Sequence, residues 1–158
     1  PVPAITPHAG EQPVPVYPVP APRPAPTTFP DPRIGSWSWG PLGWRFVYAD
    51  GGFPANTSAV LDAQIYRFDP SGYIRTGWAY DSGSWYYHAP TGEQVSGWVR
   101  DAFSWYYLDP ASGAMVTGWL LEGGSWYYLM PGSGAMATGW QRVDGTWYRF
   151  ADTGRWLG

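Results

Sequence analysis

Pairs of tryptophans at a constant spacing are the residues of this sequence with the most distinctive chemistry. Four times a Gly-Trp is followed by a second Trp seven positions later, and successive pairs are 20 or 21 residues apart. Indole faces are electron-rich and attract cations, and a quaternary ammonium group demands no hydrogen bonds. The pattern therefore predicts repeated sites for an organic cation. The pairs are Trp78/Trp85, Trp98/Trp105, Trp119/Trp126 and Trp140/Trp147.

The expected affinity of one such site is low. Each aromatic ring contributes roughly 0.5–2 kcal/mol to holding a cation, so three rings give a dissociation constant in the millimolar range. Useful affinity would require several sites engaging one polymer. Met115 and Met136 precede the next Gly-Trp, and we expect them to close the sites as soft apolar walls.

Alternation of side chains indicates that β-hairpins carry these tryptophans. Aromatic residues recur at period two, and short polar segments separate the two halves of each repeat. A two-residue turn at Glu122-Gly123 would place Trp119 directly opposite Trp126, and the same arithmetic pairs the two tryptophans of the other copies. Trp126 and Tyr128 then share the face of Trp119. The opposite face carries tyrosines that we expect in the core: Tyr86, Tyr106 and Tyr127.

Three regions follow from the composition along the chain. Residues 1–35 are rich in proline, which predicts an extended linker and, with it, a longer protein upstream. Residues 36–75 read as a divergent, longer opening repeat that caps the array. Residues 76–158 hold four regular repeats of about 20 residues. Because one hairpin is marginal alone, stability must come from stacking neighbours.

Charge and residue types exclude several functions. A net charge of −3 disfavours nucleic-acid binding, and no apolar run is long enough to span a membrane. The chain has no Cys, and its two histidines are His8, in the linker, and His88, at a strand end. No metal-ligand spacing or phosphate-binding loop is present. We therefore expect no cofactor and no metal. The chain is predicted to be non-catalytic, any catalysis lying in an upstream module.

The segment TGWLLEGGSWYYLMPGSGAMATGW resembles the choline-binding, or cell-wall-binding, repeats of Gram-positive surface proteins and phage lysins. The opening GWRFVYADGGFPAN…YRFDPSGYIRTGW is similar to their longer leading repeat, so the resemblance covers about residues 40–158. It implies an all-β solenoid of stacked β-hairpins, wound as a left-handed superhelix, with choline held between successive hairpins by two Trp and one Tyr.

Carried over to this sequence, the resemblance implies the following sites. Trp78 and Trp85 would share a site with Tyr107 of the next copy. Trp98 and Trp105 would share one with Tyr128, with Met115 nearby.

The sequence departs from the family pattern at four positions. Trp119 and Trp126 would meet Arg149 where the next copy should offer Tyr, which predicts weaker binding of a cation. The other departures are Val95 in place of Met, His88 in place of Leu and Ile65 in place of Trp.

Three functions remain open at this point. The favoured one is a targeting module, outside the cell, that anchors a secreted protein to choline-bearing teichoic acid of the cell wall. The second is binding of an α-glucan or other polysaccharide by stacking on sugar rings. The third is a rigid spacer or self-associating stalk with buried aromatics. Homodimerisation through the last hairpin, where Trp156 and Leu157 lie, is also left open.

Overall fold

The computed structural model describes residues 35–158, and every regular element in this range is a β-strand. The predicted proline-rich linker lies almost wholly outside these residues. The first strand of most hairpins begins with a glycine, and aromatic or β-branched residues recur in the strands, which suits a pleated, half-buried surface. The fold is all-β and built from repeated hairpins, as predicted. The strands are β1 (Gly35–Gly40), β2 (Gly43–Tyr48), β3 (Thr57–Leu61), β4 (Gln64–Phe68), β5 (Gly77–Asp81), β6 (Ser84–His88), β7 (Gly97–Asp101), β8 (Ser104–Leu108), β9 (Gly118–Glu122), β10 (Ser125–Leu129), β11 (Gly139–Val143) and β12 (Thr146–Phe150).

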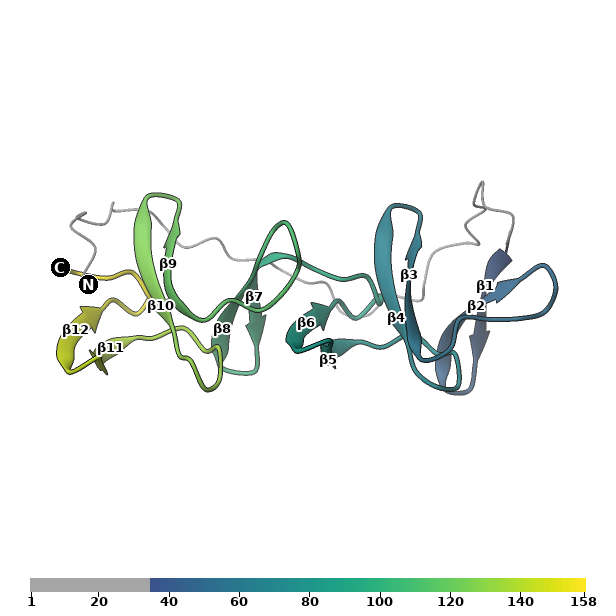
Figure 1. The fold of residues 1–158 in the computed structure, drawn as a ribbon, viewed down its shortest axis with the longest axis horizontal. Coiled ribbons are helices and arrows are strands. Elements are labelled where there is room, and N and C mark those ends of the chain that lie inside the picture. Colours follow the sequence, from purple (N-terminus) through teal and green to yellow (C-terminus); the bar gives the residue numbers. More distant parts are fainter. Residues whose placement is uncertain (1–34) are drawn as a thin grey trace. The chain divides into compact units, whose positions relative to one another are not determined.

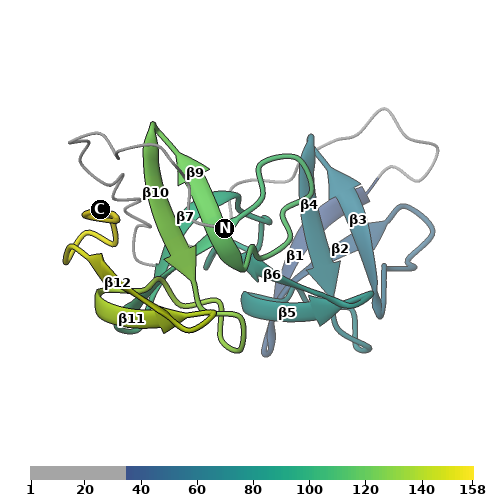
Figure 2. The same cartoon turned by 60° about the vertical axis from the view of Figure 1, so that its left-hand side comes forward.

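Consecutive strands pair into six antiparallel hairpins, each a separate two-stranded sheet. The described residues divide into two compact units, 35–95 with β1–β6 and 96–158 with β7–β12. Within a unit, neighbouring hairpins are turned relative to one another and do not continue one flat sheet (Figures 1 and 2). Both faces of a hairpin can therefore be covered: in β7–β8, Trp98 and Tyr107 on one face and Val99 and Leu108 on the other are all buried.

The hairpin register corrects one prediction. The turn of β9–β10 is Gly123-Gly124, with Glu122 paired to Ser125, so Trp119 lies opposite Tyr128 and not opposite Trp126. Both glycines have positive φ, as a type I′ turn requires. Moving the turn by one residue shifts the pairing by two, which keeps every side chain on its face. The same correction holds for the other three Trp pairs.

A short return segment after each hairpin from β3–β4 onward ties the repeats together. This segment bridges back to the second strand of its own hairpin, as Met136 does to Leu129. Within each of the two units, its backbone N–H then donates to a carbonyl of the preceding repeat. Met136 N donates to Trp105 O and Trp156 N to Trp126 O, both at 2.8 Å. Backbone hydrogen bonds thus connect hairpins that share no sheet.

Side chains of the return segments pack forward onto glycines of the next loop. Gly134 and Gly154 have φ of +75° and +81°, and a Cβ at either position would overlap the sulfur of Met115 or Met136, respectively. Ile74 lies in the same way against Gly92. These glycines are needed both for their left-handed backbone and for the close approach.

The buried side chains gather in three clusters and not in one central core. One cluster, in residues 35–95, centres on Trp37, Phe46, Tyr66 and Phe68. The other two, in residues 96–158, centre on Trp98 with Tyr127 and on Tyr148 with Trp156. Aromatic rings from successive hairpins form all three, so repetition supplies the burial that a large single core would otherwise supply. No helix that could span a membrane occurs among residues 35–158.

Candidate functional site

Two indoles and one phenol share one face of each of three hairpins. In β5–β6, Trp78 pairs with Tyr87 across the strands, and Trp85 stands two residues before Tyr87 on the same face. The other two hairpins repeat this arrangement at equivalent positions. We call these clusters aromatic corners: Trp78/Trp85/Tyr87, Trp98/Trp105/Tyr107 and Trp119/Trp126/Tyr128.

The geometry of the corners is nearly constant. The ring centroids of the two indoles are 6.4, 6.5 and 6.3 Å apart in chain order, and their planes meet at 87°, 83° and 84°. The phenol lies 5.0–5.2 Å from the first indole. Two perpendicular indole faces form two walls of a recess, in which a rounded cation can contact both π faces.

The corners differ in how far solvent reaches them. Trp85 is 43% exposed, whereas Trp98 is only 4% exposed. Trp119, Trp126 and Tyr128 are all half-buried. The first and third corners therefore present aromatic surface to a ligand, while Trp98 of the second corner is part of the core.

Rings of the next hairpin also reach two of the corners. Tyr127, at 4.9 Å, contacts Trp98, while the shared site of Trp98 and Trp105 with Tyr128 stays a prediction. Tyr148, at 5.0 Å, contacts Trp119, where Arg149 was predicted. Alternation puts Tyr127 and Tyr148 on the faces opposite Tyr128 and Arg149. Trp78 and Trp85 belong to residues 35–95 and Tyr107 to residues 96–158, so their shared site stays a prediction.

The methionines lie at the edges of the aromatic clusters. Met136 is buried among Trp98, Tyr107 and Tyr127, and its sulfur also packs on Gly154. Met115 packs on Gly134. In the first regular repeat the bridging position of these methionines is taken by Gln94, which pairs with His88, and not by Val95 as the sequence reading had it. Met130, which sequence reasoning missed, packs against the same buried cluster of Tyr148, Phe150 and Trp156 as the rings of the third corner.

A carboxylate reaches the phenol of the second corner. The Tyr107 hydroxyl donates a hydrogen bond of 3.1 Å to Glu122 at the tip of the next hairpin. Burial, and then the hydrogen bond to Glu122, raise the pKa of Tyr107 to about 12. The phenol therefore stays neutral near pH 7. Its hydrogen bond keeps the negative carboxylate of Glu122 beside the aromatic rings, and this charge favours a cation over an anion there.

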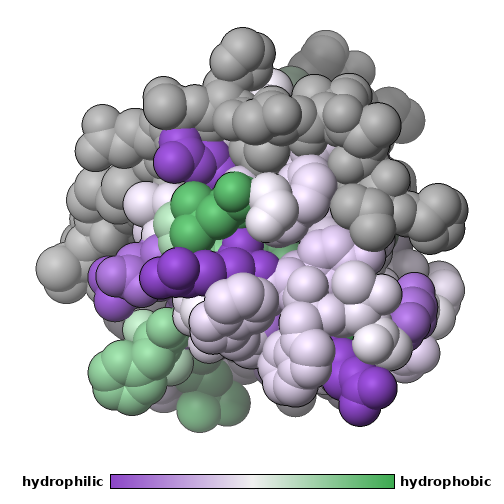
Figure 3. Space-filling model, turned by 90° about the vertical axis from the view of Figure 1, so that its left-hand side faces the viewer, coloured by the Kyte–Doolittle hydropathy of each residue, from purple (hydrophilic) through white to green (hydrophobic). Residues whose placement is uncertain are grey.

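The last hairpin carries its tryptophans differently. Trp140 and Trp147 are each 61% exposed, and Arg149 stands where the other repeats have Tyr. The guanidinium carbon of Arg149 lies 5.8 Å from the Trp140 ring centroid. The end of the chain that holds this hairpin shows pale surface of intermediate hydropathy beside hydrophilic and hydrophobic patches (Figure 3).

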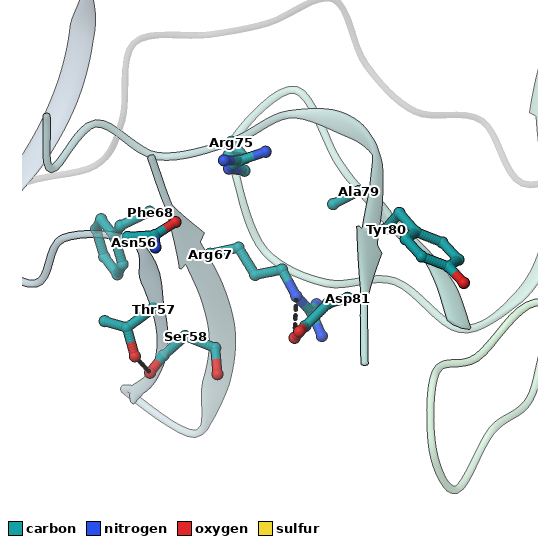
Figure 4. Close-up of a pocket in the computed structure, with 9 residues that line it drawn as sticks. All are labelled: Asn56, Thr57, Ser58, Arg67, Phe68, Arg75, Ala79, Tyr80 and Asp81. Atoms are coloured by element: carbon teal, nitrogen blue, oxygen red, sulfur yellow. Dashed lines mark hydrogen bonds and ion pairs between the residues drawn. The ribbon is translucent and has the colours of Figure 1, made fainter. Parts of the chain in front are cut away.

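A polar pocket of about 110 Å³ lies between the β3–β4 hairpin and β5. Arg67 and Asp81 face each other across it (Figure 4), with Arg67 Nε 3.3 Å from Asp81 Oδ2. The same guanidinium donates to Gln94 at 2.6 Å and stacks on Tyr86 at 3.9 Å. Arg67 is thereby committed to joining β4 to the next repeat. The pocket is lined by Asn56, Thr57, Ser58, Arg67, Phe68, Arg75, Ala79, Tyr80 and Asp81.

His88 is fully buried beside Arg67. Its Nδ1 lies 2.8 Å from the Gly92 carbonyl and its Nε2 lies 3.0 Å from Arg67 Nη1. A carbonyl only accepts and a guanidinium only donates, so the ring is neutral with its proton on Nδ1. Held in this way, His88 fastens two repeats and has no path to a substrate.

Comparison with protein families assigns the repeats. The family described as "Choline-binding repeat" matches residues 75–118 and 95–139, and that described as "Putative cell wall binding repeat" matches residues 138–155. The matched segments contain all four Trp pairs. The chain belongs to the choline-binding repeat family.

Solved structures with choline-binding repeats resemble it in fold. CbpJ from Streptococcus pneumoniae TIGR4 is 36% identical with a TM-score of 0.70, covering 76% of this chain and 41% of CbpJ. Choline binding protein F from Streptococcus pneumoniae is 30% identical with a TM-score of 0.68, covering 84% and 51%. The multimodular pneumococcal cell wall endolysin from phage Cp-1, complexed with choline, is 35% identical with a TM-score of 0.59, covering 77% and 36%. No curated protein sequence matches the chain.

Choline-binding repeats are binding modules, and in the multimodular endolysin catalysis belongs to a separate module. The chain spans at most about half the length of the relatives above, namely 41%, 51% and 36%. Its repeats therefore correspond to the choline-binding repeats of such proteins.

Proposed function

We propose that this module binds the choline groups of a cell-wall polymer in its aromatic corners and so holds the protein at the cell surface. The observation that carries the proposal is the recurrence of one geometry: two perpendicular indoles 6.3–6.5 Å apart with a phenol beside the first. The first and third corners keep this geometry while their rings reach solvent, so both can offer the same aromatic faces to a ligand. The relatives named above for their choline binding support the same ligand.

The corners suit an ammonium that carries methyl groups. Two indole faces attract the positive charge, and the phenol oxygen is the one hydrogen-bond acceptor among the three side chains of a corner, fewer than the three donors of a primary ammonium require. The first corner, with its exposed Trp85, and the third, with half-buried rings, are the sites we propose for ligand. At about 0.5–2 kcal/mol for each ring, one site binds in the millimolar range.

Affinity for a wall then comes from the polymer. Choline groups repeated along a teichoic acid would occupy several corners at once, and the second engagement is intramolecular. The module would thereby discriminate a choline-bearing surface from free choline in solution. Attachment to such a polymer places the protein outside the cell.

The test is a titration of tryptophan fluorescence with choline and with 3,3-dimethylbutan-1-ol, its neutral isostere. We expect saturation with choline and with tetramethylammonium at millimolar concentration and no comparable change with the alcohol, since only the charge differs. Trp85→Ala and Trp126→Ala should each weaken choline binding at their corner at least fivefold. Phe103→Ala is the matched control, because Phe103 is 96% exposed and belongs to no corner.

Three results would contradict the proposal. Equal responses to the alcohol and to choline would make the corners merely apolar. A response to isomaltose oligosaccharide alone would assign the module to glucan binding, and no response to any ligand would leave a structural spacer. Co-sedimentation with choline-bearing walls, competed by free choline, tests the anchoring step separately.

A further inference from the structure

The exposed face of β11–β12 combines two indoles with two guanidiniums. Trp140 pairs with Arg149 and Arg142 pairs with Trp147, so these four side chains occupy adjoining positions on one face of the hairpin. All four are exposed, whereas Val143, Tyr148 and Phe150, on the other face, are buried. No other hairpin of residues 35–158 has two arginines on the face that carries its tryptophans.

Both guanidiniums are available for a ligand. Arg142 Nε donates to the Gly145 carbonyl of its own turn at 3.3 Å, and Arg149 leans over Trp140. Among residues 35–158, neither forms an ion pair. The four cross-strand positions contain no acidic residue. The face is therefore positive and only loosely committed to intramolecular contacts.

This face is unsuited to the ligand of the aromatic corners. Two guanidiniums repel an ammonium, and Arg149 already lies over one of the indoles. The planar fork of arginine instead matches phosphate or carboxylate oxygens. Exposed indoles offer flat apolar surface to a ring that has an apolar face.

We propose that the β11–β12 face is a second binding site, which takes an anionic saccharide unit. The sugar ring stacks on Trp140 or Trp147, and Arg142 and Arg149 bind its phosphate or carboxylate substituent. Two cations on one hairpin are fewer than a nucleic-acid groove uses, and the chain as a whole carries −3, so a saccharide fits better than a polynucleotide. The site does not depend on choline binding at the corners.

The experiment follows the indole N–H resonances of the intact chain by two-dimensional NMR, assigned with Trp140→Phe and Trp147→Phe. The probes are glucose 1-phosphate and glucuronate, which separate phosphate from carboxylate recognition, with glucose and inorganic phosphate as matched controls. We expect saturable shifts of Trp140 and Trp147 with at least one anionic sugar, and binding at least tenfold weaker for glucose and for inorganic phosphate.

Variants complete the design. Arg149→Tyr restores the residue of the other repeats, so the hairpin should fold, and it should weaken the anionic sugar about tenfold. Arg142→Gln should also weaken it. Arg100→Gln is the matched control, because Arg100 pairs with Trp105 as Arg142 pairs with Trp147 but lacks a second arginine beside it; it should leave binding unchanged.

Several outcomes would overturn the inference. Equal binding of glucose and the anionic sugars would make the face a neutral stacking surface, and equal binding of inorganic phosphate would make it an adventitious ion site. Tighter binding of a thymidine decanucleotide would assign it to nucleic acid. Shifts that follow protein concentration without ligand would assign it to self-association. Choline titrated into the same samples reports on the corners independently.

Discussion

Gly154 and Gly145 have nearly equal backbone angles, with φ of +81° and +85°, but very different surroundings. A Cβ on Gly154 would overlap the sulfur of Met136, whereas one on Gly145 meets nothing within 4 Å. We predict that Gly145→Ala costs about 1–2 kcal/mol of unfolding free energy, for the left-handed backbone alone. Gly154→Ala should cost about 1–3 kcal/mol more, because the methionine must also move. Urea unfolding of both variants measures the difference; equal losses would contradict the packing argument.

Tyr107 gives a second prediction at this scale, through its bond to Glu122. The pKa of Tyr107 is raised to about 12, above the value near 10 of an unfolded chain. Its stabilisation is therefore fully present below pH 10 and is lost as the pH rises toward 12. Tyr107→Phe should lower the unfolding free energy by about 1–2 kcal/mol at pH 7 and leave a smaller decline between pH 10 and 12. Unfolding curves of the two proteins at pH 10 and at pH 12 test this. Equal declines of their unfolding free energies between these pH values would refute it.

At the scale of elements, His88 fastens β6 to β4 through Arg67. Burial, and then the guanidinium of Arg67, lower the pKa of His88, although its hydrogen bond to Gly92 and the charge of Glu93 oppose them. As the pH falls, His88 is therefore protonated in the unfolded chain before it is protonated in the folded one. Its contribution to the unfolding free energy is fully present above pH 6.5 and is lost below that value. The slope is at most about 1.4 kcal/mol for each pH unit.

His88→Leu should remove this contribution, since Leu108 and Leu129 occupy the equivalent strand ends of later repeats. We expect unfolding free energies of the variant to change less between pH 7.5 and 5 than those of the parent protein. Chemical unfolding at both values, followed by fluorescence, makes the comparison. An unchanged pH dependence would mean that carboxylates alone set it.

The sequence predicted the hairpins and the sorting of their faces because both depend on local periodicity and turn residues. It placed the β9–β10 turn one residue early, since Glu122-Gly123 and Gly123-Gly124 both offer glycine. It could not identify Tyr148 as the neighbour of Trp119, because that contact depends on how one hairpin turns on the next. The exchange of Val95 for Gln94 has a different origin, a loop one residue shorter in that repeat.

Residues of the site were predictable to a similar degree. Recurrence alone identified the paired tryptophans of the aromatic corners. The difference in exposure between Trp98, which is 4% exposed, and its half-buried counterpart Trp78 was not readable, since the two occupy equivalent positions of neighbouring repeats. The buried indole N–H groups of Trp98 and Trp126, which have no hydrogen-bond partner among the described residues, were equally invisible in the sequence.

At the scale of the whole molecule, a ligand that binds only folded repeats must stabilise them. Choline at ten times its dissociation constant should raise the unfolding free energy by about 1.4 kcal/mol for each occupied corner. Thermal unfolding in choline chloride, compared with equal sodium chloride, measures the gain. Equal shifts in the two salts would show a general ionic effect. In Trp126→Ala the gain in unfolding free energy should be smaller by the amount that the third corner contributes.

Trp156 bears on self-association at the same scale. It is buried against Trp119 and Tyr148, with ring centroids 6.2 and 6.3 Å away, so it is occupied within its own chain. Leu157 beside it is exposed. Trp156 is therefore a core residue of the last repeat and not a surface for a second copy.

The forward packing of Ile74, Met115 and Met136 has a consequence for synthesis. Each of these side chains is covered by a glycine loop that lies about one repeat later in the chain. On the ribosome that loop emerges roughly 1–4 s afterwards, at about 5–20 residues per second. A nascent repeat therefore leaves its last apolar side chain bare until its successor has been made. The array is completed from the N-terminal side, one repeat behind translation.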